Sequence, residues 1–386
     1  MRRFICLAAS LTLQASVALA QDAPAEAENP VAKRHYTFHE LFFDEQDGKL
    51  DVSNYLAKGG LVPIPIIITE PAVDQGLGFV AQFISWPDGT KDTLTRRMLG
   101  GARTGNGSYG YGYFQSGTVL DGRLNYKFGL GQGELTIAAY PGGLAIPVEY
   151  TTTFDYGVFG SVLWELPDSR FSIGPLIDIR KTETRLSLPA SLPVIAPDLT
   201  RTLKTAALGI GLHFDNRDNP LTPTKGANVY LNAKFNDGTF GSDRDFQVYD
   251  LEGYYFGSFA PRWRYGARLA VNAVRGDTPF NVMPAIDTRG VPSNRYQGET
   301  ILNTEFEVTR ELGDRWSVLG FVAAGRADAG DSRFFKDSGF IYSGGAGLRY
   351  RIARKLGLDA GLDVAVGPED TIVYFQFGHA WSRGMD

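Results

Sequence analysis

Residues 262–275 read RWRYGARLAVNAVR, a stretch in which bulky apolar side chains alternate with polar or small ones. Side chains of a β-strand point alternately to two faces. One face of this strand would hold an apolar set and the other a polar set, namely Trp263, Tyr265, Ala267, Leu269, Val271 and Ala273 against Arg264, Gly266, Arg268, Ala270 and Asn272. The pattern recurs along most of the chain. Many such strands predict an all-β fold, a closed transmembrane barrel that is apolar outside and polar inside.

The alternation predicts fourteen antiparallel strands, with sixteen as the alternative count. The predicted strands are 76–86, 107–117, 121–139, 152–166, 170–183, 201–214, 227–236, 246–258, 261–274, 298–310, 315–325, 339–351, 355–366 and 371–381. Sixteen would result if 121–139 were two strands, or if residues 61–69 joined the wall. Pro63 and Pro65 argue against a central strand in that segment, because proline cannot donate to a sheet ladder.

The links between these strands alternate in length, as in outer-membrane barrels with short periplasmic turns and longer outer loops. The first link, 87–106, is long and is assigned to the outside. The long links 184–200 and 275–297 keep to this order, whereas the turns at 260–262 and 311–314 are tight. Both ends of the barrel chain would then face the periplasm.

The N-terminus has the pattern of a secretory signal peptide. Two arginines precede an apolar stretch that is shorter than the roughly 20 residues needed to span a bilayer. Small residues at Ala18 and Ala20 suit cleavage, and the following Ala-, Pro- and Glu-rich residues predict a disordered leader. The predicted order is signal peptide 1–20, leader 21–34, short periplasmic segment 35–75, barrel 76–381 and C-terminal tail 382–386.

Composition argues against several classes of function. The single cysteine, Cys6, lies in the predicted signal peptide, so the mature chain would hold neither a disulfide nor a thiolate metal site. The net charge of −5 provides no basic surface for nucleic acid. A mean hydropathy of −0.15 suits a barrel, in which every second strand residue faces lipid. We expect no cofactor, no metal and no catalytic site.

The last predicted strand ends in an aromatic pattern. Val373, Phe375, Phe377, His379 and Trp381 would share one face. This pattern resembles the C-terminal signal through which bacterial outer-membrane barrels reach the barrel assembly machinery, with Phe375, Phe377 and Trp381 as its aromatic residues. Residues 382–386 are a departure, because the usual signal is terminal.

A turn motif, DNRDNPLTPTKG, occupies residues 215–226 between two predicted strands. Aspartate and asparagine bond their own backbone, proline fixes φ and glycine permits a positive φ, so the composition predicts an ordered turn. The marker residues are Asp215, Arg217, Asp218, Pro223 and Gly226. A structural role is the plainer interpretation, and a functional site is the sharper one.

A second motif, DTRGVPSNRYQGE, occupies residues 287–299 in the longest late loop. Arg289-Gly290 places an arginine at a tight turn. The strand after the loop carries Glu305 and Glu307 on its predicted inner face. An arginine that folds into the lumen would meet these carboxylates.

Together, the two motifs resemble the BamA/TamA superfamily of outer-membrane proteins, also called the bacterial surface antigen family. There, an Asp-x-Arg-Asn/Asp turn precedes a strand, and a later Arg-Gly loop folds inward against the barrel wall. The resemblance covers roughly residues 70–381. It implies a role in outer-membrane biogenesis. Residues 21–75 are too short for the periplasmic POTRA domains of the first-named members, so the match is to a branch without them.

One departure concerns the partner of the loop arginine. Assembly-factor members of the family place an aspartate after Phe-Val in the second strand past the loop, where this chain has Ala323. We therefore expect Arg289 to pair with other inward carboxylates. The candidates are Asp359, Asp363, Glu305 and Glu307.

Three weaker patterns remain. Asp44, Asp47 and Asp51 have a spacing similar to a calcium loop but lack its regular oxygens and distal glutamate, so a turn before a helix is the alternative. His213 faces inward, and a serine partner would make a hydrolase, which sequence alone does not establish. Inward arginines and carboxylates predict ion-pair ladders or, more sharply, a substrate path.

The leading hypothesis is a barrel of the Gram-negative outer membrane that inserts or translocates a protein or lipid through an imperfectly sealed contact between its first and last strands. An unpaired edge is a template for another strand, and Gly76, Gly78 and Gly378 would weaken pairing there. The expected partners are outer-membrane lipids, the barrel assembly machinery and a client protein or lipid. A passive pore or structural barrel is the alternative, favoured by Ala323, and an outer-membrane hydrolase comes third.

Overall fold

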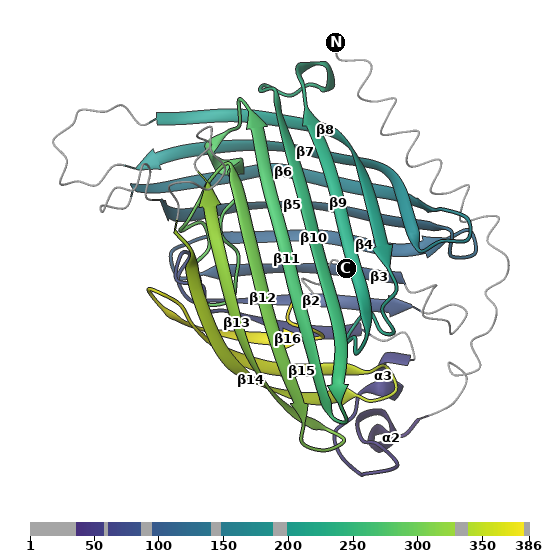
Figure 1. Ribbon diagram of the computed structural model, residues 1–386. Coiled ribbons are helices and arrows are strands. Elements are labelled where there is room, and N and C mark those ends of the chain that lie inside the picture. Colours follow the sequence, from purple (N-terminus) through teal and green to yellow (C-terminus); the bar gives the residue numbers. More distant parts are fainter. Residues whose placement is uncertain are drawn as a thin grey trace.

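The computed structural model describes residues 36–57, 61–85, 95–139, 148–187, 199–328 and 339–381. They form one antiparallel sheet of 16 strands, in which each strand pairs with the next along the chain, and the sheet curls into a nearly closed barrel (Figure 1). The strands are β1 (Leu61–Ile68), β2 (Gly76–Ser85), β3 (Thr95–Thr104), β4 (Tyr109–Val119), β5 (Leu124–Ala139), β6 (Val148–Glu165), β7 (Phe171–Ser187), β8 (Leu199–Asp215), β9 (Gly226–Asn236), β10 (Phe246–Ala260), β11 (Trp263–Gly276), β12 (Thr300–Glu311), β13 (Trp316–Asp328), β14 (Ile341–Ala353), β15 (Leu358–Val366) and β16 (Thr371–Phe377). The helical elements are α2 (Phe38–Phe42), α3 (Ser53–Ala57), η3 (Gly238–Phe240) and η4 (Phe280–Val282). Within the described ranges, no helix has the length and apolar character needed to cross a membrane.

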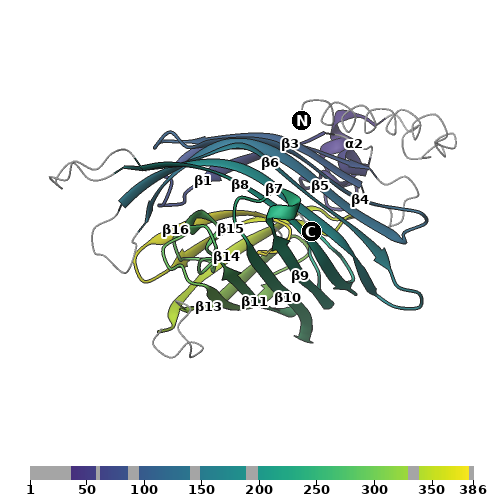
Figure 2. The same cartoon turned by 90° about the horizontal axis from the view of Figure 1, so that it is seen from above.

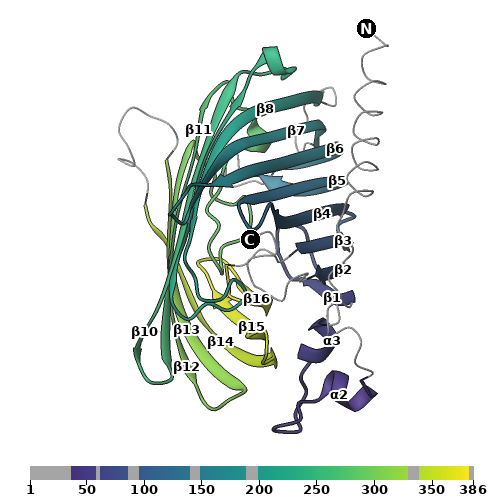
Figure 3. The same cartoon turned by 90° about the vertical axis from the view of Figure 1, so that its right-hand side faces the viewer.

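The first strands lie opposite the last ones. Figure 2, a view from above, places β1 to β6 on one side of the barrel and β9 to β15 on the other. Helices α2 and α3 lie together below β1 at one end of the barrel, which we call the base (Figure 3). Val52 N donates to Ile352 O there, so the turn 354–357 also lies at the base. The alternate turns 120–123, 166–170, 216–225, 261–262 and 312–315 lie at the same end.

The two faces of the wall differ as the sequence pattern predicts. In β11, Leu269 points outward and is 47% exposed, whereas its neighbours Arg268 and Ala270 point inward and are buried. An exposed apolar side chain occurs on each strand from β2 to β16: Leu77, Leu99, Tyr111, Phe128, Val162, Ile177, Leu208, Leu231, Tyr255, Leu269, Phe306, Val322, Leu348, Leu362 and Phe375. Such a surface is unfavourable in water, at about 25 cal/mol per Å², but fits the hydrocarbon of a bilayer.

The strand count of fourteen is wrong, and the alternative count of sixteen is correct. Residues 61–68 do join the wall, as β1, because proline is tolerated at the edge of a sheet. The stretch 121–139 holds one strand, β5, and not two. The second missing strand is β3, which lies inside the link that was assigned to an outer loop.

Strand β3 has a weak sequence pattern. Its outer face reads Arg97, Leu99, Gly101 and Arg103, so only one of these positions carries a large apolar side chain. It nevertheless pairs along its length with β2 and with most of β4, and a tight turn at 105–108 leads into β4. Strand pairing depends on backbone hydrogen bonds. Strand β3 therefore forms although its outer face lacks the apolar alternation that predicts a strand.

The predicted chain segments are described only in part. Signal peptide 1–20, leader 21–34 and tail 382–386 lie outside the described residues. The predicted periplasmic segment 35–75 is divided, because β1 belongs to the wall and the barrel begins before residue 76.

Candidate functional site

The loop between β11 and β12, residues 277–299, folds into the barrel. Its two arms meet where Ile286 N donates to Tyr296 O at 2.9 Å. Ile286 and Val291 are buried against the start of β12. The loop tip at Arg289 is thereby carried to the inner face of the wall, where it is buried as well.

Gly290 allows the loop tip to approach the wall closely. Its φ is 91°, in the left-handed region that favours glycine. A Cβ at this position would lie 3.1 Å from the Cβ of Ser343 and 3.3 Å from that of Ala365. The Gly290 N–H donates to the Tyr374 hydroxyl at 3.0 Å. A larger residue would therefore strain the backbone and press on β14 and β15.

Arg289 lies among three carboxylates. Its guanidinium nitrogens are each 2.9 Å from an oxygen of Glu305, Glu307 or Asp363. The central carbon of the guanidinium lies 3.6 Å from the centre of the Phe321 ring. A buried charge costs several kcal/mol unless partners compensate it. The carboxylates of β12 and β15 supply that compensation, so the loop tip forms an ionic bridge between distant strands.

A ladder of inward ion pairs extends this bridge. Arg349 binds Asp363 through two nitrogens, at 2.5 and 2.8 Å. Arg268 reaches Glu305 at 3.3 Å and Glu252 at 2.9 Å. Charged side chains thus join β10, β11, β12, β14, β15 and the loop. We call this set the lumen ion cluster: Arg268, Arg289, Arg349, Glu252, Glu305, Glu307 and Asp363.

Asp359 is the candidate partner that Arg289 does not contact. It pairs with Arg351 at 2.7 Å and lies 3.8 Å from Arg264, nearer the base. Asp359 and Asp363 share the inner face of β15, but four residues of a strand span roughly 13 Å. One arginine therefore reaches Asp363 and not Asp359.

The position of Ala323 shows how the cluster obtains a carboxylate without an aspartate at that position. This alanine stands opposite Glu305 in the pairing of β12 with β13. Side chains that are opposite one another in an antiparallel pair have Cβ atoms roughly 5 Å apart. Glu305 therefore brings its carboxylate close to the place where an aspartate at position 323 would bring one.

The predicted turn at 215–226 is ordered by its own side chains. Arg217 binds the Asp215 carboxylate, with a closest approach of 2.7 Å. Asp218 accepts the backbone N–H groups of residues 224 and 225, at 2.9 and 3.2 Å. Gly226 has a φ of 104°, and a Cβ there would lie 2.6 Å from the backbone oxygen of residue 216. Pro223 is buried within the turn.

The same turn reaches across the base to the end of the chain. Asn219 donates to Leu356 O at 2.8 Å, beside β15. Arg217 lies 3.3 Å from the ring nitrogen of His379, whose backbone N–H donates to Leu221 O at 2.9 Å. This base turn is unusually long because it reaches the β14–β15 turn and the C-terminal segment.

The last strand is shorter than predicted. Strand β16 ends at Phe377, and Gly378 follows with a φ of 85°. Phe375 and Phe377 are exposed on the outer face, but Trp381 is buried in the lumen. The prediction that Trp381 shares their face is wrong, because the left-handed turn at Gly378 ends the two-residue alternation.

Trp381 packs into a site within the barrel. Its ring stacks on Tyr254 and contacts Phe256, with centroids 5.9 and 5.7 Å apart. Its Nε1 donates to Glu305 at 3.2 Å. Gly266 provides the space, since a Cβ there would lie 2.9 Å from the indole. The C-terminal segment thereby contacts the lumen ion cluster.

Sequence and structure comparisons place this arrangement in a family. The Omp85 superfamily domain matches residues 179–380, which include the turn, the inward loop and the last strand. The chain belongs to the Omp85 superfamily. The predicted resemblance to BamA- and TamA-type proteins is thus confirmed.

Solved structures share the barrel of this Omp85-type protein at low sequence identity. BamA from Haemophilus ducreyi lacking POTRA domains 1–3 has a TM-score of 0.53 and 12% identity, covering 82% of this chain and 68% of that one. CdiB from Escherichia coli has a TM-score of 0.55 and 10% identity, covering 82% and 61%. CdiB from Acinetobacter baumannii has a TM-score of 0.51 and 12% identity, covering 82% and 58%. The chain thus spans less than two thirds of either CdiB, and the likeness establishes the fold alone. No curated protein sequence matches the chain.

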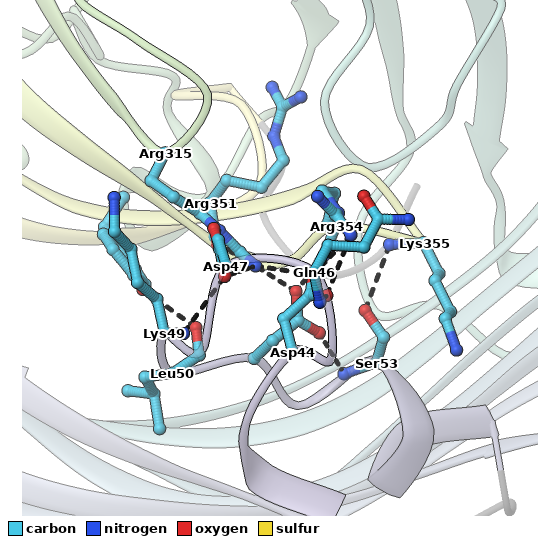
Figure 4. A network of polar contacts seen from close by, with 12 residues as sticks. Asp44, Gln46, Asp47, Lys49, Leu50, Ser53, Arg315, Arg351, Arg354 and Lys355 are labelled. Atoms are coloured by element: carbon cyan, nitrogen blue, oxygen red, sulfur yellow. Dashed lines mark hydrogen bonds and ion pairs between the residues drawn. The ribbon is translucent and has the colours of Figure 1, made fainter. Parts of the chain in front are cut away.

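A second ionic cluster of this Omp85-type barrel holds residues 36–57 to the base (Figure 4). Arg315, in the turn before β13, is fully buried and pairs with Asp44, Asp47 and Asp51 at 2.6, 2.7 and 2.6 Å. We call these four residues the base clamp. The hydrogen bond from Arg315 lowers the pKa of Asp47 to about 2, from an ordinary 3.8.

The calcium-loop interpretation of these aspartates is wrong. An arginine occupies the position that a cation would take, and the described residues contain no group of His, Cys, Asp or Glu side chains suited to a metal ion. The alternative, a turn before a helix, is correct, since α3 begins at Ser53 and Asp51 accepts the Ser53 N–H at 2.8 Å. Arg354 adds an ion pair to Asp44 at 2.7 Å.

His213 has partners that suit a structural role. Its Nε2 lies 2.8 Å from Asn228 Oδ1, and its ring stacks on Tyr230 with centroids 4.1 Å apart. Asn228, and not a serine, therefore occupies the hydrogen-bonding side of Nε2.

Proposed function

We propose that this Omp85-type barrel acts in outer-membrane biogenesis, by inserting or translocating a protein or lipid client through the seam between β1 and β16. The observation that carries the proposal is that β1 and β16 close the barrel without pairing, since the sheet runs from β1 to β16 in chain order and ends there. A hydrogen bond from Thr69 Oγ1 to the Val373 carbonyl crosses the seam.

Two prolines make the β1 edge a poor partner for β16. Register between β1 and β2 is continuous along all of β1, and proline enters a strand where its nitrogen faces away from the ladder. Pro63 and Pro65 therefore remove two donors from the edge that faces the seam. A weakly held edge is a template on which a client strand can pair.

Strand β16 also offers little pairing length. It has 7 residues, whereas β12, β13 and β14 have 12 or 13. Gly378 then turns the chain into the lumen. Gly76 and Gly78, predicted at the seam, belong to β2 and lie between β1 and β3, because β2 is not the edge strand.

The lumen ion cluster supports the proposal by fixing the strands on one side of the seam. It braces β10 to β15, and the bond from Gly290 to Tyr374 together with the burial of Trp381 holds β16 to that unit. Opening of the seam then requires β1 and its neighbours to move away from β16. Phe375 and Phe377 face outward on β16, which suits contact with outer-membrane lipids and docking of this strand on the barrel assembly machinery.

A disulfide across the seam tests the proposal. Cys6 is the single cysteine of the sequence, so Thr69→Cys with Val373→Cys introduces one defined pair beside an existing contact. The control pair is Val364→Cys with Val373→Cys, because these residues face one another in the paired strands β15 and β16.

In cells that depend on the variant, the locked seam is expected to lower the level of client barrels or lipids in the outer membrane until a reductant is added. The control pair is expected to leave the envelope unchanged. A normal envelope with the seam fully locked would contradict the proposal.

A passive pore is the alternative, supported by Ala323 in place of the family's aspartate. Its signature would be a steady conductance in planar bilayers that the seam disulfide does not alter. A conductance that appears only after reduction supports an opening seam instead.

A further inference from the structure

Above the base, the lumen-facing side of β1 to β6 carries no charged side chain in its described part. Six glycines of β4, β5 and β6 occupy inward-facing positions: Gly110, Gly112, Gly129, Gly131, Gly133 and Gly157. In the described part of these strands, inward charged side chains occur at Arg96, Lys127 and Glu165, all near the base. The rest of this inner wall is apolar or glycine, apart from a few uncharged polar residues.

The glycines leave a cavity of about 550 Å³ against the wall. Leu135, Phe154 and Phe159 line it from the strands, and Val73 lines it from the turn between β1 and β2. Charge reaches it at Glu134 and at the Asp178–Arg180 ion pair of β7, but most of its lining surface is apolar. This volume lies within the range of roughly 300–1,000 Å³ that is usual for small-ligand sites. Phe159 points into the lumen and is still 38% exposed. A water-filled barrel is normally polar inside, so this surface calls for an apolar occupant.

The cavity reaches the edge strand β1 at Ile68. Ile64, Ile66 and Ile68 face the lumen, while Leu61 and Ile67 are exposed on the outer face. Strand β1 is thus apolar on both sides, and a hydrocarbon chain passing around its free edge from the bilayer would meet no charged side chain of β1.

A polar cavity of about 530 Å³ lies at the base end of the same inner face. Arg96 and Lys127 line it together with carboxylates, namely Asp121, Glu165, Asp215 and Asp218. Lys127 Nζ lies 3.5 Å from the Tyr230 hydroxyl. Lys127 and Gly129 point the same way on β5. A lipid with its tail in the apolar cavity would therefore have the Lys127 ammonium on the base side of the same inner face, where its phosphate would lie.

We propose that the apolar cavity holds one acyl chain of a membrane phospholipid, which enters through the seam between β1 and β16. The inference rests on the proposed function and names its client class as a lipid. The opposite wall suits an acyl chain less well, because the seven charged side chains of the lumen ion cluster line it.

Photolabelling tests this site in the full barrel reconstituted in nanodiscs. The probe is a phosphatidylglycerol that carries a diazirine near the end of one acyl chain, and the labelled peptides are mapped by mass spectrometry. Labels are expected on the inner positions of β4, β5 and β6. Gly157→Leu fills the cavity, because nothing lies within 3.9 Å of a Cβ at that position. This variant is expected to lower labelling about tenfold, because it would expel about two methylene groups of the acyl chain from the cavity, and that loss of burial weakens binding about tenfold.

Gly320→Leu is the matched control, since its Cβ also has 3.9 Å of space but points to the outer face of β13. It is expected to leave inner-wall labelling unchanged. Gly110→Leu is a second filling variant, with 3.7 Å of space, and heat-modifiable migration on gels identifies which variants fold. Labels confined to the outer face, or inner labels that survive both filling variants, would overturn the site.

The seam disulfide of Thr69→Cys with Val373→Cys separates this inference from the proposed function. Locking the seam before the probe is added is expected to abolish inner labelling, and reduction is expected to restore it. Inner labelling through a locked seam would overturn the entry route. A locked-seam defect in cells without any inner labelling would refute the lipid site alone, whereas inner labelling without that defect would refute the proposed function.

Discussion

The two sides of the barrel wall are held together by different means. Strands β10 to β15 are braced from within by the lumen ion cluster, the inward loop and Trp381. Strands β1 to β6 have their ladder bonds and, above the base, an inner face composed mainly of glycine and apolar residues. Glycine weakens a strand because it has no side chain to pack and more backbone freedom to lose. We infer a rigid half that carries the inward Arg-Gly loop and a deformable half that borders the seam through β1.

The largest expected effect is the loss of the central cation of the rigid half. Arg289→Ala leaves Glu305, Glu307 and Asp363 without their shared partner in a site that is nearly closed to solvent. Removal of one partner of a buried ion pair costs roughly 3–5 kcal/mol. Urea unfolding in detergent micelles, followed by tryptophan fluorescence, measures the change in unfolding free energy.

A control arginine on the same loop separates burial from charge. Arg295 pairs with Glu369 at 2.8 Å, but both side chains are partly exposed. Arg295→Ala is therefore expected to cost no more than about 1 kcal/mol. Equal losses for the two variants would show that the lumen ion cluster does not brace the rigid half.

The base clamp provides the next effect. Arg315→Ala removes the shared partner of Asp44, Asp47 and Asp51 and should release residues 36–57 from the base. A loss of roughly 3 kcal/mol in docking raises the protease-accessible population about a hundredfold. Limited proteolysis with cleavage sites mapped in 36–57 measures it. Arg310→Ala, at an exposed arginine of β12, is the control and is expected to leave the cleavage rate unchanged.

Acid should weaken the same contact. The pKa of Asp47 is lowered to about 2 from 3.8 in the docked state, so its contribution is present above pH 3.8 and is lost as the pH falls toward 2. Pepsin cleavage within residues 36–57 is therefore expected to rise between about pH 4 and pH 2. Release of the segment between neutral pH and about pH 5 would mean that another group controls docking.

The smallest expected effect lies at the seam itself. Pro63→Val and Pro65→Val restore two backbone donors on the β1 edge, each worth about 0.5–1.5 kcal/mol if a partner on β16 accepts it. The seam should then open less often. In the variant that carries Thr69→Cys and Val373→Cys, oxidation should proceed faster and inner-wall lipid labelling should fall. Unchanged rates would indicate that these prolines do not set the strength of the seam.

The strands were largely predictable because alternation is a local property. Fourteen stretches with a clear apolar face are strands, whereas β3 was missed because arginines and glycines interrupt its outer face. Pro63 and Pro65 argued against a wall strand at residues 61–68, although proline is tolerated in a strand at the edge of a sheet. The inward loop was also predictable, since the arginine of an Arg-Gly turn that precedes inward-facing glutamates is expected to pair with them inside the barrel.

The remaining contacts depend on register and on long-range closure. Glu305 stands opposite Ala323 only once β12 and β13 are paired, and Arg315 meets Asp44 across 271 positions of the chain. The position of Trp381 follows from a positive φ at Gly378, and a glycine in the sequence permits that angle without requiring it. No periodicity within one segment carries such information.

Amide hydrogen exchange of the barrel in nanodiscs tests the division of the wall most directly. We expect amides of β2 to β5, which are paired on both edges, to exchange much faster than those of β12 and β13, because the ionic braces lie on the opposite wall. Slow and uniform exchange around the whole barrel, with β2 to β5 as protected as β13, would contradict this division.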